Sequence, residues 1–115
     1  MGIDKSLLAG STTTLVLKLL EEKDMYGYEM IDTLSKKSNH TFDLKAGTLY
    51  PILHTLEKNS LVESYEKKAE NERIRKYYHL TKKGKKMLQE KHQEWVIYST
   101  AVNKILKGGT GYATV

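Results

Sequence analysis

The chain has 115 residues, of which 39% are hydrophobic and 29% charged, and its formal net charge at pH 7 is +5. This length and composition are typical of one folded domain with a modest core and argue against intrinsic disorder. The absence of cysteine excludes disulfide bonds and thiolate metal sites. No apolar segment approaches the roughly 18 residues of a membrane span, and the N-terminus lacks a secretory signal pattern, so we expect a cytoplasmic protein.

Three helices are predicted in the first half of the chain. Leucines between Leu7 and Leu20 predict a helix over residues 5–23, although its polar, β-branched middle (11–14) needs packing to remain helical. Residues 25–28 predict a turn. A second helix follows, with Met30, Ile31 and Leu34 on one face, and ends near residue 39.

The third predicted helix covers residues 45–59 and carries Leu49, Leu53 and Leu56 at helical spacing. Pro51 is the only proline in the chain. Proline is tolerated in the opening turn of a helix, where its missing N–H has no partner to lose, so the helix should begin between residues 45 and 48.

Two strands with a polar loop between them are predicted at residues 61–65 and 73–80, which are rich in β-branched and aromatic side chains. Alternation in the second strand places Ile74, Tyr78 and Leu80 on a packed face. Arg73, Arg75, Tyr77 and His79 fall on the opposite face, which should be exposed.

The last predicted helix begins after Thr81, a good N-cap, and ends at Lys107, before two glycines. About 26 residues at ~1.5 Å each make a rod of about 39 Å. Such a rod is too long to bury its apolar face against so small a body, so a second chain is expected there. We predict that the dimer interface contains Leu8, Leu88, Trp95, Tyr98, Val102 and Ile105.

The predicted order of elements is that of a winged helix-turn-helix with a long C-terminal dimerisation helix, an α+β fold that is mostly α. We divide it into a DNA-binding domain (1–80), a dimerisation helix (81–107) and a flexible tail (108–115). Nine basic and two acidic residues in 67–86 give that segment a net charge of +7, which leaves −2 for the other residues. Concentrated positive charge favours binding to nucleic acid, although a solvated lysine-rich surface has the same composition.

The chain also resembles the PadR-type transcriptional regulators. The matching motifs are Tyr26-Gly27-Tyr28-Glu29, Gly47-Thr48-Leu49-Tyr50-Pro51, Leu53, Leu56-Glu57-Lys58, Leu61-Val62, Arg75-Lys76-Tyr77-Tyr78, Leu80-Thr81 and Gly84. Where the family usually has a glycine before the first wing strand, this chain has Asn59-Ser60. Asparagine adopts the left-handed conformation readily, so we expect Asn59 to supply the left-handed residue and the turn to be kept, while the exact end of the helix stays open.

The resemblance implies a homodimeric repressor that binds double-stranded operator DNA and has no catalytic function. The predicted DNA-binding residues are Tyr28, Lys45, Thr48, Tyr50 and His54 on the helices, and Lys67, Lys68, Arg73, Arg75 and Tyr77 on the wing. An α-helix fits the major groove and wing cations would contact phosphates. The alternative for Tyr50 and His54 is that they simply cover the core.

A single C-terminal helix is similar to a small subfamily of multidrug-sensing repressors, in which a tryptophan stacks on planar ligands at the dimer centre. By that similarity Trp95 would bind a planar aromatic ligand, in a pore lined by Thr14, Lys18, Leu88 and Ser99. The alternatives are a regulator whose Trp95 only packs in the interface, and a winged-helix adaptor for protein or RNA. The sequence has no H-x-x-x-H pair, G-x-S-x-G or P-loop, so no enzyme, metal or cofactor is predicted.

Overall fold

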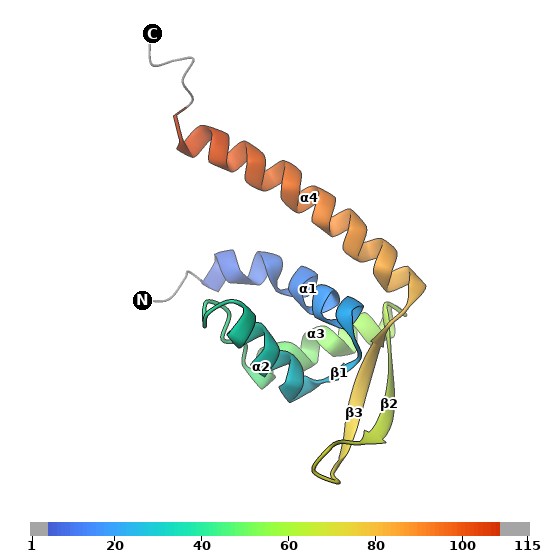
Figure 1. Cartoon of the computed structure of the whole chain (residues 1–115). Helices are drawn as coiled ribbons and strands as arrows, with labels where there is room; N and C mark the ends of the chain where they lie inside the picture. Colours follow the sequence, from blue (N-terminus) through green and yellow to red (C-terminus); the bar gives the residue numbers. More distant parts are fainter. Residues whose placement is uncertain (1–4, 109–115) are drawn as a thin grey trace.

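The computed structural model describes residues 5–108, which form four helices and a three-stranded antiparallel sheet (Figure 1). The elements are α1 (Lys5–Glu22), β1 (Met25–Tyr26), α2 (Gly27–Lys37), α3 (Ala46–Lys58), β2 (Val62–Lys68), β3 (Ile74–Leu80) and α4 (Lys82–Leu106). This is the predicted winged helix-turn-helix with a long last helix. None of the helices in the described range is long and apolar enough to cross a membrane. Most of the predicted tail, residues 109–115, lies outside that range.

The core lies between α1, α2, α3 and the inner face of the sheet. Its largest fully buried side chains are Val16, Leu17, Met30, Leu49, Leu53, Val62 and Leu80. The weak middle of α1 is helical because it packs on this core: Thr12 is buried, and its hydroxyl donates to the Leu8 carbonyl at 2.8 Å. Such a bond satisfies a buried hydroxyl without a side-chain partner.

Pro51 lies in the second turn of α3 rather than in its opening turn. The helix begins at Ala46, within the predicted range, so the proline ring removes the N–H that would otherwise bond to the Gly47 carbonyl. Gly47 is exposed, so water can reach that carbonyl. The expectation about the helix start is confirmed, but the reason given for tolerating Pro51 is wrong.

Two local predictions about the backbone are also wrong. Residues 25–28 are not a turn, because Met25 and Tyr26 form β1, paired with Tyr78 and Tyr77 of β3, and α2 starts directly at Gly27. The left-handed residue after α3 is Ser60, with φ of 61°, while Asn59 has φ of −93° and caps the helix. One residue later than expected, the chain makes the same reversal into β2.

The three strands place β3 between β1 and β2. The inner face of the sheet packs on the core through Met25, Val62, Tyr78 and Leu80. Ile74 shares the parity of Tyr78 and Leu80, but it is 66% exposed because β3 extends beyond the core into the wing. The expectation that Ile74 is packed is therefore wrong.

Helix α4 starts as predicted, with the Thr81 hydroxyl accepting a hydrogen bond from the Gly84 N–H at 3.0 Å. Gly84 and Leu88 are its buried residues, and they join it to the rest of the molecule. Beyond its first turns α4 runs back above α1 (Figure 1). Its large hydrophobic side chains there are exposed, namely Trp95, Val96, Ile97, Tyr98, Ile105 and Leu106.

Candidate nucleic-acid interface

The first turns of α3 present polar side chains to solvent. Leu49, Leu53 and Leu56 fix α3 on the core, while Thr48 and His54 on the helix and Lys45 at its N-cap are exposed. Lys45 is the N-cap residue, and its carbonyl accepts from the N–H groups of Thr48 and Leu49. An exposed polar face at the N-terminal end of a helix is the part that reaches base edges in helix-turn-helix proteins.

Tyr50 joins α3 to the start of α2. Its ring lies against Gly27, where an added Cβ would come within 2.2 Å of the phenol oxygen. It also contacts the Tyr28 ring edge-on, with centroids 6.5 Å apart. Burial raises the pKa of Tyr50, with the Arg75 guanidinium acting in the opposite direction. The start of α2 and the first turns of α3 therefore meet at this tyrosine, which is both a packing residue and 40% exposed.

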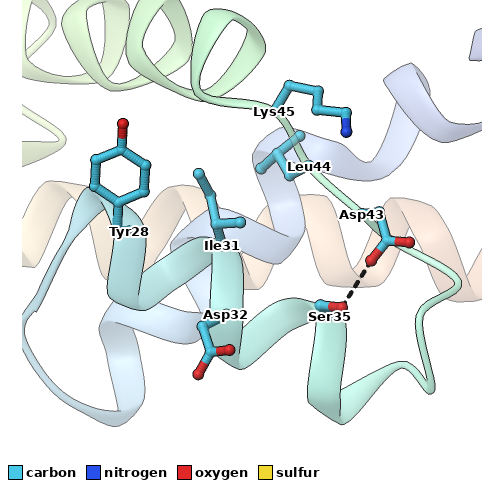
Figure 2. A pocket seen from close by; sticks show the side chains of 7 residues that line it. All are labelled: Tyr28, Ile31, Asp32, Ser35, Asp43, Leu44 and Lys45. Carbon is cyan, nitrogen blue, oxygen red and sulfur yellow. Dashed lines mark hydrogen bonds between the residues drawn. The ribbon is translucent and has the colours of Figure 1, made fainter.

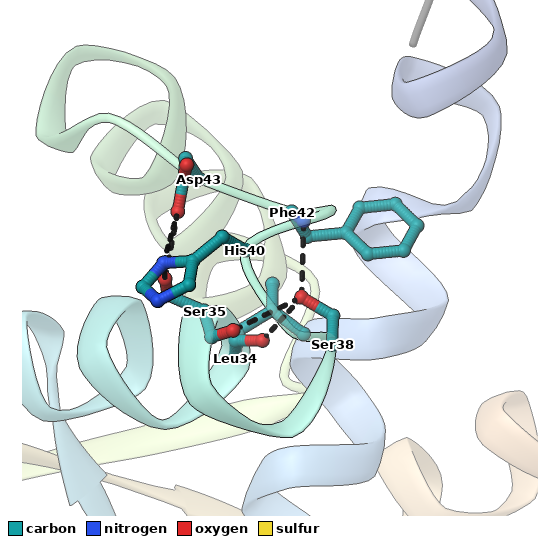
Figure 3. Close-up of polar contacts among 6 residues, drawn as sticks. All are labelled: Leu34, Ser35, Ser38, His40, Phe42 and Asp43. Carbon is teal, nitrogen blue, oxygen red and sulfur yellow. Dashed lines mark hydrogen bonds and ion pairs between the residues drawn. The ribbon is translucent and has the colours of Figure 1, made fainter. Parts of the chain in front are cut away.

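The connection between α2 and α3 is held by two serines (Figure 3). The Ser35 hydroxyl donates to the Asp43 carboxylate at 2.7 Å and is 2.8 Å from Nδ1 of His40. The Ser38 hydroxyl donates to the Leu34 carbonyl at 2.7 Å and accepts from the Phe42 N–H at 3.0 Å. The hydrogen bond from Ser35 lowers the pKa of Asp43. These bonds fix the turn that sets the position of α3 relative to α2.

A shallow pocket of about 420 Å³ lies beside this connection (Figure 2). Tyr28, Ile31, Asp32 and Ser35 line it from α2, and Asp43, Leu44 and Lys45 line it from the connection. Two carboxylates against one lysine make it a poor phosphate site. No group of three or more histidine, aspartate or glutamate side chains in residues 5–108 is arranged to hold a metal ion.

The wing is the β2–β3 hairpin, which projects away from α4 (Figure 1). Lys67, Lys68 and Arg73 are exposed near its tip, where Lys68 lies 3.7 Å from the Glu72 carboxylate. Exposed pairs of this kind contribute about 0–1 kcal/mol and leave the lysine available to another anion. Arg75 is half-buried. The basic residues of 67–86 do not all belong to the wing. Four of them lie in the first turns of α4, namely Lys82, Lys83, Lys85 and Lys86.

Tyr77 was expected to be exposed on the wing, but it is only 8% exposed. The rings of Tyr26 and Tyr65 cover it from the two neighbouring strands. Tyr26 and Tyr65 were missed by sequence reasoning, since their proximity follows from the strand register. The high tyrosine content, eight in 115 residues, was the available signal.

The predicted dimer and ligand residues lie on α1 and α4. Trp95 is 49% exposed, and its ring centroid is 6.2 Å from that of Tyr98. Ile105 is 76% exposed, whereas Leu88 is 5% exposed and has little surface left for a partner or a ligand. Lys18 is exposed and 2.8 Å from Glu21, which raises its pKa. Leu8, Thr14, Ser99 and Val102 are half-buried.

The chain is similar to a known family of transcriptional regulators and to solved structures of such regulators. Residues 16–90 match the model of the transcriptional regulator PadR-like family. An uncharacterised protein of Lysinibacillus sphaericus is 32% identical over 106 residues, which is 92% of this chain and 97% of that protein. A PadR-like transcriptional regulator of Bacillus cereus is 35% identical, with a TM-score of 0.79, over 89% of this chain and 97% of the other. A transcriptional regulator of Clostridium thermocellum is 34% identical, with a TM-score of 0.79, over 87% and 97% of the two chains.

Proposed function

The chain belongs to the PadR-like family of DNA-binding transcriptional regulators, not to a family of enzymes, and from that premise we propose that it is a cytoplasmic, homodimeric repressor of a pseudo-palindromic operator. In this proposal two copies of α3 enter successive major grooves about 34–36 Å apart. The two wings contact the flanking phosphates. The observation that carries the DNA-binding part is the exposed surface of the first turns of α3 together with the exposed wing cations Lys67, Lys68 and Arg73.

If the protein binds duplex DNA as proposed, its affinity should fall steeply as the salt concentration rises, and part of that fall should be traceable to single wing residues. Selection from a random duplex library supplies the operator, and fluorescence anisotropy then gives its Kd at several salt concentrations. Replacing Arg75 with alanine removes one phosphate contact, so affinity should fall about tenfold on all duplexes. The slope of log K against log salt should become shallower by about one unit.

A matched control removes the same charge elsewhere. Lys104 is exposed in the last turn of α4. That end of the helix lies away from the wing (Figure 1), so Lys104→Gln should leave both affinity and slope unchanged. Weak binding that is equal for all duplexes, before any substitution, would support the adaptor function instead.

The proposed dimer explains the apolar surface of α4. Contiguous exposed apolar patches on soluble proteins mark interaction sites. The exposed side chains of Trp95, Tyr98 and Ile105 lie on one side of the helix, because they are spaced by three and seven residues. Leu7 on α1 adds to the exposed apolar surface of the molecule. A second copy of the chain would cover this stripe.

We include a ligand in the proposal because Trp95 is only half covered and lies beside Tyr98. A planar aromatic molecule between two Trp95 rings would change the spacing of the wings and release the operator. Because Lys18 is paired with Glu21, its charge gives less preference for anionic ligands than an unpaired lysine would.

Trp95 is the only tryptophan, so its fluorescence reports on this site alone. Titration with planar aromatic cations and acids should quench the emission and weaken operator binding over the same concentration range. The variant Trp95→Leu should bind the operator but lose the response to the ligand. If no compound of either charge quenches Trp95, the ligand-independent regulator is the better description.

A further inference from the structure

Three tyrosines form a ladder across the outer face of the sheet, one from each strand. Tyr26 of β1 and Tyr77 of β3 pack edge to face with centroids 5.4 Å apart, and Tyr77 stacks on Tyr65 of β2 at 5.8 Å. The register places them side by side, because Tyr77 is the strand partner of both others. Aromatic pairs at these distances stabilise a sheet beyond their burial alone.

The ladder is fixed at one end by a carboxylate. The Tyr65 hydroxyl donates to Oδ2 of Asp24 at 2.6 Å, and Nδ1 of His79 is 2.9 Å from Oδ1 of the same residue. The bond to Asp24 raises the pKa of Tyr65 to about 12. Burial opposes ionisation of Asp24, but the bonds with Tyr65 and His79 outweigh it and lower its pKa. Asp24 lies in the short connection between α1 and β1, so the ladder is attached to the body of the domain.

Two wing cations rest on the ladder. Nζ of Lys67 lies 4.8 Å from the centroid of Tyr77, and Cζ of Arg75 lies 5.0 Å from that of Tyr26. Lys67 and Arg75 are strand partners and so share this face. Nε of Arg75 is buried and has no hydrogen-bond partner among the described residues. A freely solvated arginine would keep Nε in water, so packing on Tyr26 sets the conformation of this side chain.

We propose that the tyrosine ladder positions the wing cations for duplex phosphates, with Tyr26 as the positioning residue for Arg75 and Tyr77 for Lys67. Long basic side chains lose rotamer freedom when they bind a phosphate. Lysine and arginine side chains that are already held on ring faces lose less rotamer freedom when they bind. The inference rests on the proposed function, in which these cations contact DNA.

A double-mutant cycle between Tyr26 and Arg75 tests the inference. Tyr26→Leu removes the ring face, and Tyr26→Phe keeps it. A cation–π contact at an exposed site corresponds to about a two- to fivefold change in affinity. We expect Tyr26→Leu to weaken operator binding by that factor in the native background and to have almost no effect in Arg75→Ala. Tyr26→Phe should have almost no effect on affinity in either background.

The outcomes separate the inference from the proposed function. If Arg75→Ala leaves both affinity and salt slope unchanged, the proposed phosphate contact is wrong. If Arg75→Ala behaves as expected but Tyr26→Leu weakens binding equally in both backgrounds, Tyr26 has only a structural role and the inference is overturned. Thermal unfolding of each variant checks the fold. Should Tyr26→Leu not fold, Tyr26→Met takes its place in the cycle, because its longer, unbranched side chain adapts to the space of the ring and also has no ring face.

Discussion

Replacing Ile105 with glutamate is expected to make the protein monomeric and to weaken operator binding by about two to four orders of magnitude. Ile105 is 76% exposed within the chain, so a charge there leaves the folded domain intact. In the proposed dimer the same charge would be buried against apolar side chains, which is costly without a partner. In a dimer, binding of the first half-site holds the second subunit close to the other half-site, at a high effective concentration. A monomer loses this gain in affinity, which is a factor of about 10²–10⁴.

Light scattering after size exclusion measures the mass, and anisotropy on the selected operator measures the affinity. Gln93→Glu is the control, because it adds the same charge on the same helix about half a turn from the stripe of Trp95 and Val102. That variant should remain dimeric with native affinity. A dimeric Ile105→Glu protein with native operator affinity would show that this stripe is not the interface.

The parts of the fold that depend on local chemistry could be predicted from the sequence. The bounds of α3 and α4 follow from apolar spacing and from the Thr81 cap, and both agree with the structure within about a residue. β1 could not be predicted this way. Two residues have no periodicity, and Met25 and Tyr26 are extended only because β3, some fifty residues later, pairs with them.

The candidate site also has features that the local sequence predicts and features that depend on distant parts of the chain. Exposure of Lys45, Thr48 and the wing tip follows from the apolar faces of α3 and the hairpin, so their presentation could be predicted. The covering of Tyr77 could not, because alternation along β3 shows which face a side chain is on but not what the neighbouring strands place over it. The contact between Tyr50 and Gly27 likewise depends on how closely α2 and α3 approach.

Replacing Gly84 with alanine is expected to destabilise the protein by about 3 kcal/mol or more, through overpacking at the joint between the wing and α4. An added Cβ would lie 2.1 Å from the Leu61 carbonyl oxygen and 2.5 Å from Cδ1 of Leu80. The Leu61 oxygen cannot move aside, because it belongs to the backbone and accepts hydrogen bonds from the N–H and hydroxyl of Thr81. The start of α4 must therefore shift, which also disturbs the Thr81 cap.

Thermal unfolding measured at one protein concentration, because a dimer melts in a concentration-dependent way, should show a fall of roughly 12 °C or more for Gly84→Ala. Gly47→Ala is the matched control: it makes the same change in a helix where nothing lies within 4 Å of the new Cβ, and its stability should be unchanged or slightly higher. A melting temperature of Gly84→Ala within a few degrees of native would contradict the expectation. Since Gly84 sets the angle between the proposed dimerisation helix and the wing, the folded fraction of this variant should also bind operator more weakly, because its two wings no longer match the half-site spacing.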